Sequence, residues 1–158
     1  MAFSRIYVEI TNCCNLACSF CHGTRREAAF LSAEQFAQLA QRLRGQTGYL
    51  YFHVMGEPLL HPQLPELMQI AGRMGFRVVL TTNGTLLARR QAELLDAAAL
   101  HKVSVSLHAF EANGGAEMAA YLDCCTAFGQ AAAARGILVD YRLWNLDGAQ
   151  TKGLHDRN

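Results

Sequence analysis

The stretch Ile6-Tyr7-Val8-Glu9-Ile10 is followed closely by Cys14-Asn15-Leu16-Ala17-Cys18-Ser19-Phe20-Cys21. The first part alternates apolar and polar residues, which is the period-two pattern of a β-strand and predicts one over about residues 5–11. In the second part three cysteines stand at spacings of four and three, so three thiolates on one short loop can hold one metal centre. Protein cysteines usually bind all the irons of a [4Fe–4S] cluster, and three cysteines would leave one iron open. An open coordination position is where metal chemistry takes place.

Composition limits the class of protein. The chain has 158 residues, 51% of them hydrophobic, so it can bury one sizeable core as one domain. Lysine and arginine number 14 against 13 aspartate and glutamate, a balance that gives no reason to expect a nucleic acid or an anionic membrane as partner. No apolar run is long enough to span a bilayer, and the N-terminus does not have the form of a signal peptide.

The cysteines point to a reducing compartment. Their close clustering differs from a disulfide scaffold, which spreads its bridges around a small fold. We therefore expect a cytoplasmic protein, because clustered cysteines in that compartment more often bind metal or catalyse. The six cysteines are Cys13-Cys14, Cys18, Cys21 and Cys124-Cys125.

Strand-like and helix-like segments alternate along the rest of the chain. A helix is predicted to begin near Ser32, which has Gln35 three residues later in the spacing of a capping box, and to end at Gly45. Further strands are predicted at residues 49–55, 76–80, 103–107 and 137–143, and further helices from Pro62 to Gly75, over residues 86–99 and up to Ala134.

This alternation predicts an α/β fold. Strands that alternate with helices lie parallel and are joined by right-handed crossovers. Five strands cannot close an eight-stranded barrel, so we expect an open curved sheet or a partial (β/α) barrel over residues 1–144. The polar remainder, residues 145–158, is expected to be an irregular tail or the start of a further segment.

Each unusual short motif follows or ends a predicted strand. The cysteine loop follows the first strand, and Gly56-Glu57-Pro58 follows the second. Thr81-Thr82-Asn83-Gly84 follows the third, and Ser104-Val105-Ser106-Leu107-His108 ends the fourth. Parallel strands bring their carboxyl ends to one rim, where the ligands of such folds collect. The four motifs are therefore expected to meet in space.

In order and in strand context, these motifs resemble the core of radical S-adenosylmethionine (SAM) enzymes, from residue 6 to about residue 143. The resemblance implies that Cys14, Cys18 and Cys21 bind a [4Fe–4S] cluster, whose open iron is chelated by the amino and carboxylate groups of SAM. It also implies that an external donor such as flavodoxin or ferredoxin supplies one electron. That electron cleaves SAM to methionine and a 5′-deoxyadenosyl radical, which abstracts hydrogen from a substrate that the sequence does not name.

The same resemblance implies roles for further residues. Gly56 has no side chain, so its backbone can approach a ligand closely. Glu57 can accept a charge-assisted hydrogen bond from the ammonium group of SAM. His108 could face either SAM or the substrate. An apolar wall for the adenine and short polar groups for the ribose or carboxylate are expected from Phe20, Asn83 and Ser106.

Two departures from the family pattern keep other interpretations open. Met55 stands where the family often has a first glycine, and a full family core usually has six strands, so the chain could be truncated or shortened. It could then be a non-catalytic iron–sulfur or SAM-binding fragment that needs further sequence or a partner. A structural zinc protein is a third interpretation, with His22 or Cys13 as the fourth ligand.

Simpler structural roles also stay open for single residues. Asn83 could be a helix cap, Ser106 a buried serine bonded to the main chain, and Phe20 a packing residue. Cys125 lies on the apolar stripe of a helical pattern and is expected to be a small core residue. Structural or surface positions are expected for two further residues, His53 and His61.

Overall fold

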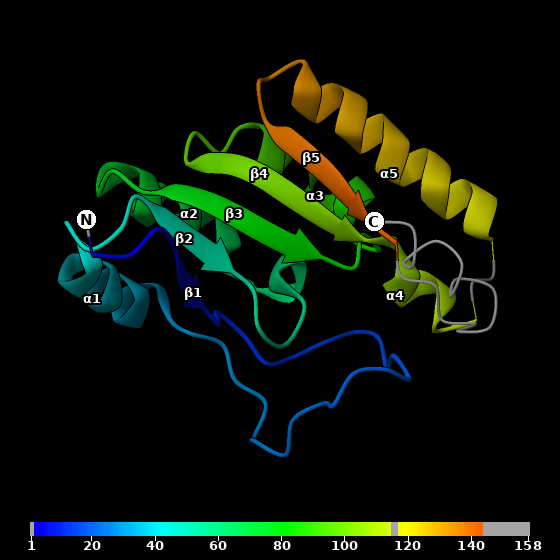
Figure 1. Cartoon of the computed structure of the whole chain (residues 1–158), viewed down its shortest axis with the longest axis horizontal. Coiled ribbons are helices and arrows are strands. Elements are labelled where there is room, and N and C mark those ends of the chain that lie inside the picture. The colour runs from blue at the N-terminus through cyan, green and yellow to red at the C-terminus, as the bar shows by residue number, and fades with distance from the viewer. Residues whose placement is uncertain (1, 115–116, 144–158) are drawn as a thin grey trace, which may run out of the picture.

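The computed structural model describes residues 2–114 and 117–143. Its centre is a sheet of five parallel strands in the order β1-β2-β3-β4-β5, so each strand pairs with its neighbours in the sequence (Figure 1). The order is that of a partial (β/α) barrel, and the predicted fold class is confirmed. The strands are β1 (Ile6–Val8), β2 (Tyr49–Phe52), β3 (Arg77–Thr82), β4 (Leu100–Ser106) and β5 (Leu138–Arg142).

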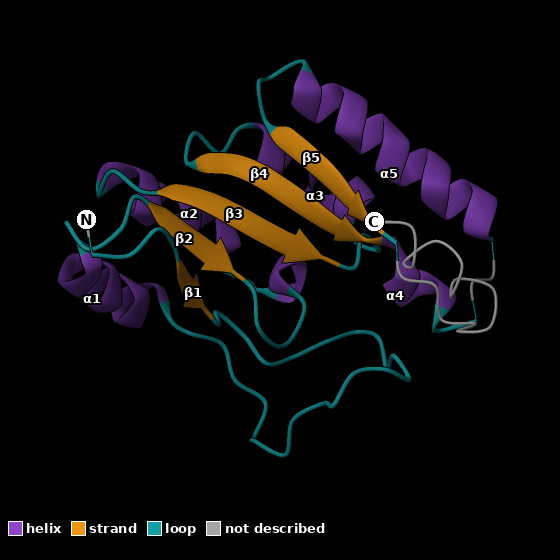
Figure 2. Ribbon diagram, in the orientation of Figure 1, coloured by secondary structure: helices purple, strands orange, loops and turns teal. Residues whose placement is uncertain are grey.

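Helices connect the strands (Figure 2). The helix α1 packs against α2, α3 packs against α5, and α5 also contacts β5. Within the described residues, none of these helices is both long enough and apolar enough to cross a membrane. Their bounds are α1 (Ala33–Leu43), α2 (Leu64–Arg73), α3 (Leu87–Leu95), α4 (Leu107–Glu111) and α5 (Met118–Ala133), and the 3₁₀ turn η1 (Pro58–Leu60) precedes α2.

The helices cover one face of the sheet. Side chains alternate between the two faces along a strand, and those that meet the helices are fully buried, such as Phe52 of β2 and Val103 of β4. The opposite face is more exposed toward the edges of the sheet, at Tyr7, Lys102 and Asp140, whereas its central side chains are buried, among them Val79, Thr81 and Ser104. The core that joins sheet and helices includes Leu50, Phe52, Val103 and Val105 from the strands and Phe36, Leu67, Leu94 and Phe128 from the helices.

Local signals explain two of the helix starts. Ser32 Oγ accepts a hydrogen bond of 3.1 Å from Gln35 N, and Gln35 Oε1 accepts one of 2.9 Å from Ser32 N, so the predicted capping box is confirmed. The proline in the first turn of α2 is Pro65, whereas Pro62 precedes the helix. Cys125 is 1% exposed on α5, which confirms its place in the core.

The structure corrects several predicted boundaries: among others, the helix predicted over residues 86–99 ends at Leu95, and β4 begins at Leu100 and not at residue 103. The strand β1 is shorter than residues 5–11, and Thr11 instead forms an isolated antiparallel bridge with Phe30. Residues 53–55 leave the sheet, and Val54 has a φ of 122°, outside the range of an extended strand. The short helix α4, which begins directly at the end of β4, was not predicted. Residue 144, the end of the predicted domain, and the expected tail at 145–158 lie outside the described residues.

The two histidines that were expected to be structural or superficial differ in burial. His61 is fully buried after η1. His53 is half-buried after β2, with its ring centroid 6.2 Å from that of Tyr7. Burial lowers the pKa of His53, and the positive charge of Arg142 on β5 lowers it further. The expectation of a structural position is confirmed for His61, and for His53 it stays a prediction.

Candidate cofactor site at the carboxyl ends of the strands

The cysteine loop leaves β1 and has no regular secondary structure between residues 12 and 29. Cys14, Cys18 and Cys21 are free thiols, the first and last exposed and Cys18 half-buried. Among the residues that the structure describes, no three His, Cys, Asp or Glu side chains lie close enough together to hold one metal ion. Zinc would need this closeness, because all its ligands bind one ion, with each sulfur about 2.3 Å from it. The cysteines of a [4Fe–4S] cluster can lie farther apart, because each binds a different iron.

The environment of Cys14 disfavours the negatively charged form of its thiol. Partial burial is the largest cause of a raised pKa of the Cys14 thiol, and a hydrogen bond with the Leu16 main chain opposes the rise. Charges on Glu57, Cys18 and Cys21 raise the same pKa further. The thiolate form of Cys14 is therefore disfavoured in the protein alone, and a cationic group such as the irons of a cluster would stabilise it.

Glu57 ties three segments of the rim together. Its side chain is buried at 1% exposure. The oxygen Oε1 accepts hydrogen bonds from Leu59 N at 2.9 Å and Thr82 Oγ1 at 2.7 Å, and Oε2 accepts one from Asn83 N at 2.7 Å. Its own main-chain N–H donates to Cys13 O at 2.7 Å, so the cysteine loop is bonded to the end of β2. Burial raises the pKa of the Glu57 carboxyl, and the three hydrogen bonds oppose the rise.

Gly56 is required by the chain itself. Its φ is +74°, and a Cβ atom there would lie 2.5 Å from Thr11 O and 2.7 Å from Cys13 O. The close approach that we expected toward a ligand is therefore made by the main chain of the cysteine loop. The contacts of Glu57 and Gly56 together place this loop against the turn after β2.

Asn83 joins the cysteine loop to the end of β3. Its Nδ2 donates to Asn15 Oδ1 at 2.9 Å, and its Oδ1 accepts from both the main-chain N and the hydroxyl of Thr85, at 3.0 and 2.7 Å. Asn15 Nδ2 donates in turn to Thr85 Oγ1 at 2.8 Å. The N-cap of α3 is Leu86, so the interpretation of Asn83 as its cap is wrong: Asn83 closes a turn instead.

The remaining predicted residues lie at the end of β4. Ser106 is half-buried at the start of α4, and its hydroxyl makes no capping hydrogen bond with that helix. His108 is buried on α4, with Nδ1 3.1 Å from Arg142 O at the end of β5. Its ring centroid lies 5.1 Å from that of Phe20, so the cysteine loop also contacts α4.

Residues that the sequence did not indicate complete the site. Asn113, after α4, bonds to Ala17 and Cys18 of the cysteine loop. Tyr121 on α5 donates its hydroxyl hydrogen to Asn83 O at 2.7 Å. Asn113 is followed by Gly114, a pair that is typical of turns, but nothing in the sequence indicates that its side chain reaches a segment 95 residues away.

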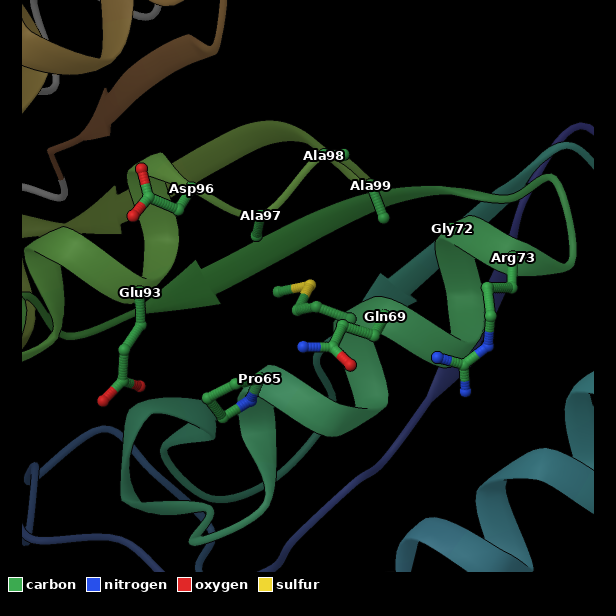
Figure 3. A pocket seen from close by; sticks show the side chains of 10 residues that line it. Pro65, Gln69, Gly72, Arg73, Glu93, Asp96, Ala97, Ala98 and Ala99 are labelled. Carbon is green, nitrogen blue, oxygen red and sulfur yellow. The ribbon is translucent and has the colours of Figure 1, made fainter.

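A cavity lies elsewhere, on the helical side of the sheet (Figure 3). It has a volume of about 410 Å³ between α2 and the segment from α3 to β4. None of the predicted site residues lines it. Its walls are Pro65, Met68, Gln69, Gly72, Arg73, Glu93, Asp96 and Ala97 to Ala99.

The loops that follow β1, β2 and β3, and the helix that follows β4, are thus in mutual contact, as predicted from the parallel sheet. The family model of the Radical SAM superfamily matches residues 8–155. This chain belongs to the radical SAM superfamily. Members of the radical SAM superfamily use a [4Fe–4S] cluster and S-adenosylmethionine.

Two curated radical SAM relatives match part of the chain. An Fe-coproporphyrin III synthase of Methanosarcina barkeri is 36% identical over 102 residues, which are 63% of this chain and 26% of that protein. A probable GTP 3′,8-cyclase of Methanocella arvoryzae is 37% identical over 111 residues, which are 68% of this chain and 35% of that protein. The aligned part thus amounts to 26% and 35% of the two relatives' own lengths.

Solved structures show the same fold. BtrN in complex with AdoMet and 2-DOIA superposes with a TM-score of 0.65 at 25% identity, over 87% of this chain and 56% of that one. Streptococcus suis SuiB bound to its precursor peptide SuiA gives a TM-score of 0.68 at 16% identity, over 99% of this chain and 37% of that one. The second likeness concerns the fold alone.

Proposed function

We propose that this chain forms the catalytic core of a radical SAM enzyme, with Cys14, Cys18 and Cys21 as the ligands of a [4Fe–4S] cluster. One observation carries the proposal: the loop with the three free thiols is held against the end of β2 by Glu57, the end of β3 by Asn83 and α4 by Asn113. A three-cysteine cluster keeps one iron open for a ligand. Held by Cys14, Cys18 and Cys21, the cluster would supply the electron for cleavage of bound SAM to methionine and a 5′-deoxyadenosyl radical, which would abstract hydrogen from a substrate.

The chain's own residues bind, orient and shield. Glu57 and Gly56 set the turn after β2 beside the cysteine loop, which supports a role for this turn in the SAM pocket. The Glu57 carboxylate accepts three hydrogen bonds from the turns after β2 and β3. We therefore propose that Glu57 orients these turns, in addition to its predicted contact with the ammonium group of SAM. Asn83 orders the turn after β3 in the same way and is proposed to contact SAM through this turn.

Two further residues are proposed to contact SAM directly. Ser106 is half-buried, and its hydroxyl does not cap α4, so it can bond the ribose or the carboxylate. Phe20 is half-buried beside His108 and can lie against the adenine. The electron is proposed to come from an external flavodoxin or ferredoxin. A reducing compartment such as the cytoplasm is proposed because all six cysteines are free.

Anaerobic reconstitution with iron and sulfide tests the ligand set. We expect about four irons per wild-type chain and a marked loss in Cys14→Ala, Cys18→Ala and Cys21→Ala. Cys124→Ala is the matched control, because Cys124 is a half-buried cysteine on α5, outside the cysteine loop, and it should keep the full cluster. Full cluster content in Cys18→Ala would contradict the assignment of that ligand. Zinc in place of iron in protein purified without oxygen would favour the structural zinc interpretation.

Formation of 5′-deoxyadenosine from SAM by the reduced protein tests catalysis. A second candidate function is a non-catalytic module that binds the cluster and SAM, because the activities of the curated relatives belong to proteins of which the aligned segment is 26% and 35%. A full cluster without any SAM cleavage would support this second function. Cleavage by the chain alone would exclude it.

A further inference from the structure

The side chain of Asn113 spans the gap between the cysteine loop and α4. Its Oδ1 accepts a hydrogen bond of 2.9 Å from the main-chain N–H of Ala17. Its Nδ2 donates to Ala109 O at 2.8 Å and lies 3.2 Å from Cys18 Sγ. One amide group therefore contacts the loop at two successive residues and the helix at a third.

The partners determine the orientation of this amide. Ala17 N can only donate and Ala109 O can only accept, so the amide oxygen must face Ala17 and the amide nitrogen must face Ala109. The nitrogen that faces Ala109 also faces Cys18 Sγ. The amide N–H group is thus directed at the sulfur by contacts that do not involve the sulfur.

The sulfur needs such a donor once it loses its proton. Cys18 Sγ lies 3.6 Å from Ala109 O, and as a thiol it donates to this carbonyl. A metal-bound thiolate has no proton to donate, so sulfur and carbonyl oxygen would then repel each other. The Asn113 amide lies within hydrogen-bond distance of both atoms and compensates for the lost contact.

We propose that Asn113 is a positioning residue for the cluster. The Asn113 side chain holds Cys18 in place and donates a hydrogen bond to its sulfur. This inference rests on the proposed function for the cluster itself. Reduction adds one electron to the cluster from the external donor, and no bond forms or breaks in this step. An N–H dipole directed at a cluster sulfur stabilises the more negative, reduced form more than the oxidised form, so Asn113 raises the reduction potential.

The test is a redox titration of the reconstituted protein without SAM, followed by electron paramagnetic resonance. In Asn113→Ala we expect the equilibrium constant of reduction to fall about tenfold, equivalent to about 59 mV for one electron. Asn113→Asp keeps an acceptor for Ala17 N and loses the N–H donor, so it should show a fall of at least the same size. If Asn113→Ala does not retain the cluster, the aspartate variant supplies the potential.

Asn15→Ala is the matched control. Asn15 also ties the cysteine loop to the rim, through Asn83 and Thr85, but no hydrogen bond from its side chain to a cysteine sulfur is recorded among the described residues. It should loosen the loop and leave the reduction potential within error of the wild type. Equal potentials in wild type and Asn113→Asp, or equal shifts in Asn15→Ala and Asn113→Ala, would overturn the proposal.

A second readout needs no cluster. In the apo protein, the amide hydrogen of Ala17 should exchange several-fold faster in Asn113→Ala and remain close to wild type in Asn113→Asp. Unchanged exchange in Asn113→Ala would refute the positioning role. Because this measurement and the redox titration do not use SAM, failure of SAM cleavage would sink the proposed catalysis alone. A wild-type chain that binds no cluster would sink the proposed function and, with it, the redox role of Asn113.

Discussion

The hydroxyl of Tyr121 donates a hydrogen bond of 2.7 Å to the main-chain carbonyl of Asn83, which links α5 to the turn after β3. The ring of Tyr121 is stacked on Phe110 with centroids 4.0 Å apart and an interplanar angle of 7°. Burial is the largest cause of a strongly raised pKa of Tyr121, so its hydroxyl stays protonated and remains a donor. A helix that carries no predicted site residue therefore supports the rim.

Tyr121→Phe should remove this support without changing the packed volume. The Asn83 carbonyl would be left in a buried place without its donor, and the free energy of unfolding should fall by about 1–2 kcal/mol. Tyr141→Phe is the matched control, because the Tyr141 hydroxyl also donates to a main-chain carbonyl, that of Cys125, at 3.0 Å. Tyr141 is 41% exposed and water can replace its bond, so the loss should stay below about 1 kcal/mol. Equal losses in urea denaturation of the two variants would contradict this ranking.

Periodicity and turn residues were sufficient to predict the sheet and the place of each motif. An apolar run such as Val78 to Leu80 is typical of a buried strand. Buried strands that alternate with helices predict a parallel sheet. The partners of Glu57 could not be predicted in this way. Its three donors come from η1 and from the end of β3, and which side chain fills a given space at a rim depends on three-dimensional packing.

The same limit applies to α4 and Asn113. The segment Leu107–Glu111 is too short for a helical period to be visible in the sequence. The alternating residues before it, such as Val103 and Val105, favoured the prediction that the strand continues to residue 107. Asn113 looked like an ordinary turn residue, because turns commonly contain asparagine. Its contacts with Ala17 and Cys18 are long-range and leave no local pattern.

Glu57→Gln should destabilise the fold and change its pH dependence. A Gln amide replaces one acceptor oxygen with an NH₂ group facing an N–H donor, which should lower the free energy of unfolding by about 1–3 kcal/mol at neutral pH. Because the pKa of Glu57 is raised above its usual 4.5, the folded state binds more protons than the unfolded state just above pH 4.5. The contribution of Glu57 to stability is therefore greatest below this pH and falls as pH rises through the folded pKa.

Urea denaturation at a series of pH values checks the sign. The advantage of wild type over Glu57→Gln should shrink as the pH is raised from 4.5 and then become constant. Glu66→Gln serves as the control, because Glu66 is an exposed glutamate on α2. A wild-type advantage that grows with pH would show that the hydrogen bonds, and not burial, dominate the carboxylate.

Gly56→Ala should be far more damaging than a comparable change at another glycine of positive φ. The new Cβ would meet Thr11 O and Cys13 O at 2.5 and 2.7 Å, so overpacking adds to the conformational cost, roughly 3 kcal/mol in all. Gly45 has a φ of +79° and no neighbour within 4 Å of such a Cβ, so Gly45→Ala should cost only about 1 kcal/mol. Equal midpoints of urea denaturation for the two variants would show that the cysteine loop can move away from the turn after β2.

His61 should make the protein sensitive to mild acid. It is fully buried, its Nδ1 accepts a hydrogen bond from Gln63 N at 3.1 Å, and its Nε2 lies 2.9 Å from Leu31 O, so the ring is neutral with its proton on Nε2. Burial lowers the pKa of His61 below 6.5, and the Leu31 carbonyl opposes this change. The unfolded state then binds more protons than the folded state, so stability is lost as pH falls below about 6.5 toward the folded pKa.

Between pH 7.5 and pH 5.5 the free energy of unfolding should fall more in wild type than in His61→Gln, whereas the exposed His22→Gln should follow wild type. Parallel pH profiles for wild type and His61→Gln would show that this imidazole is not the acid-sensitive group.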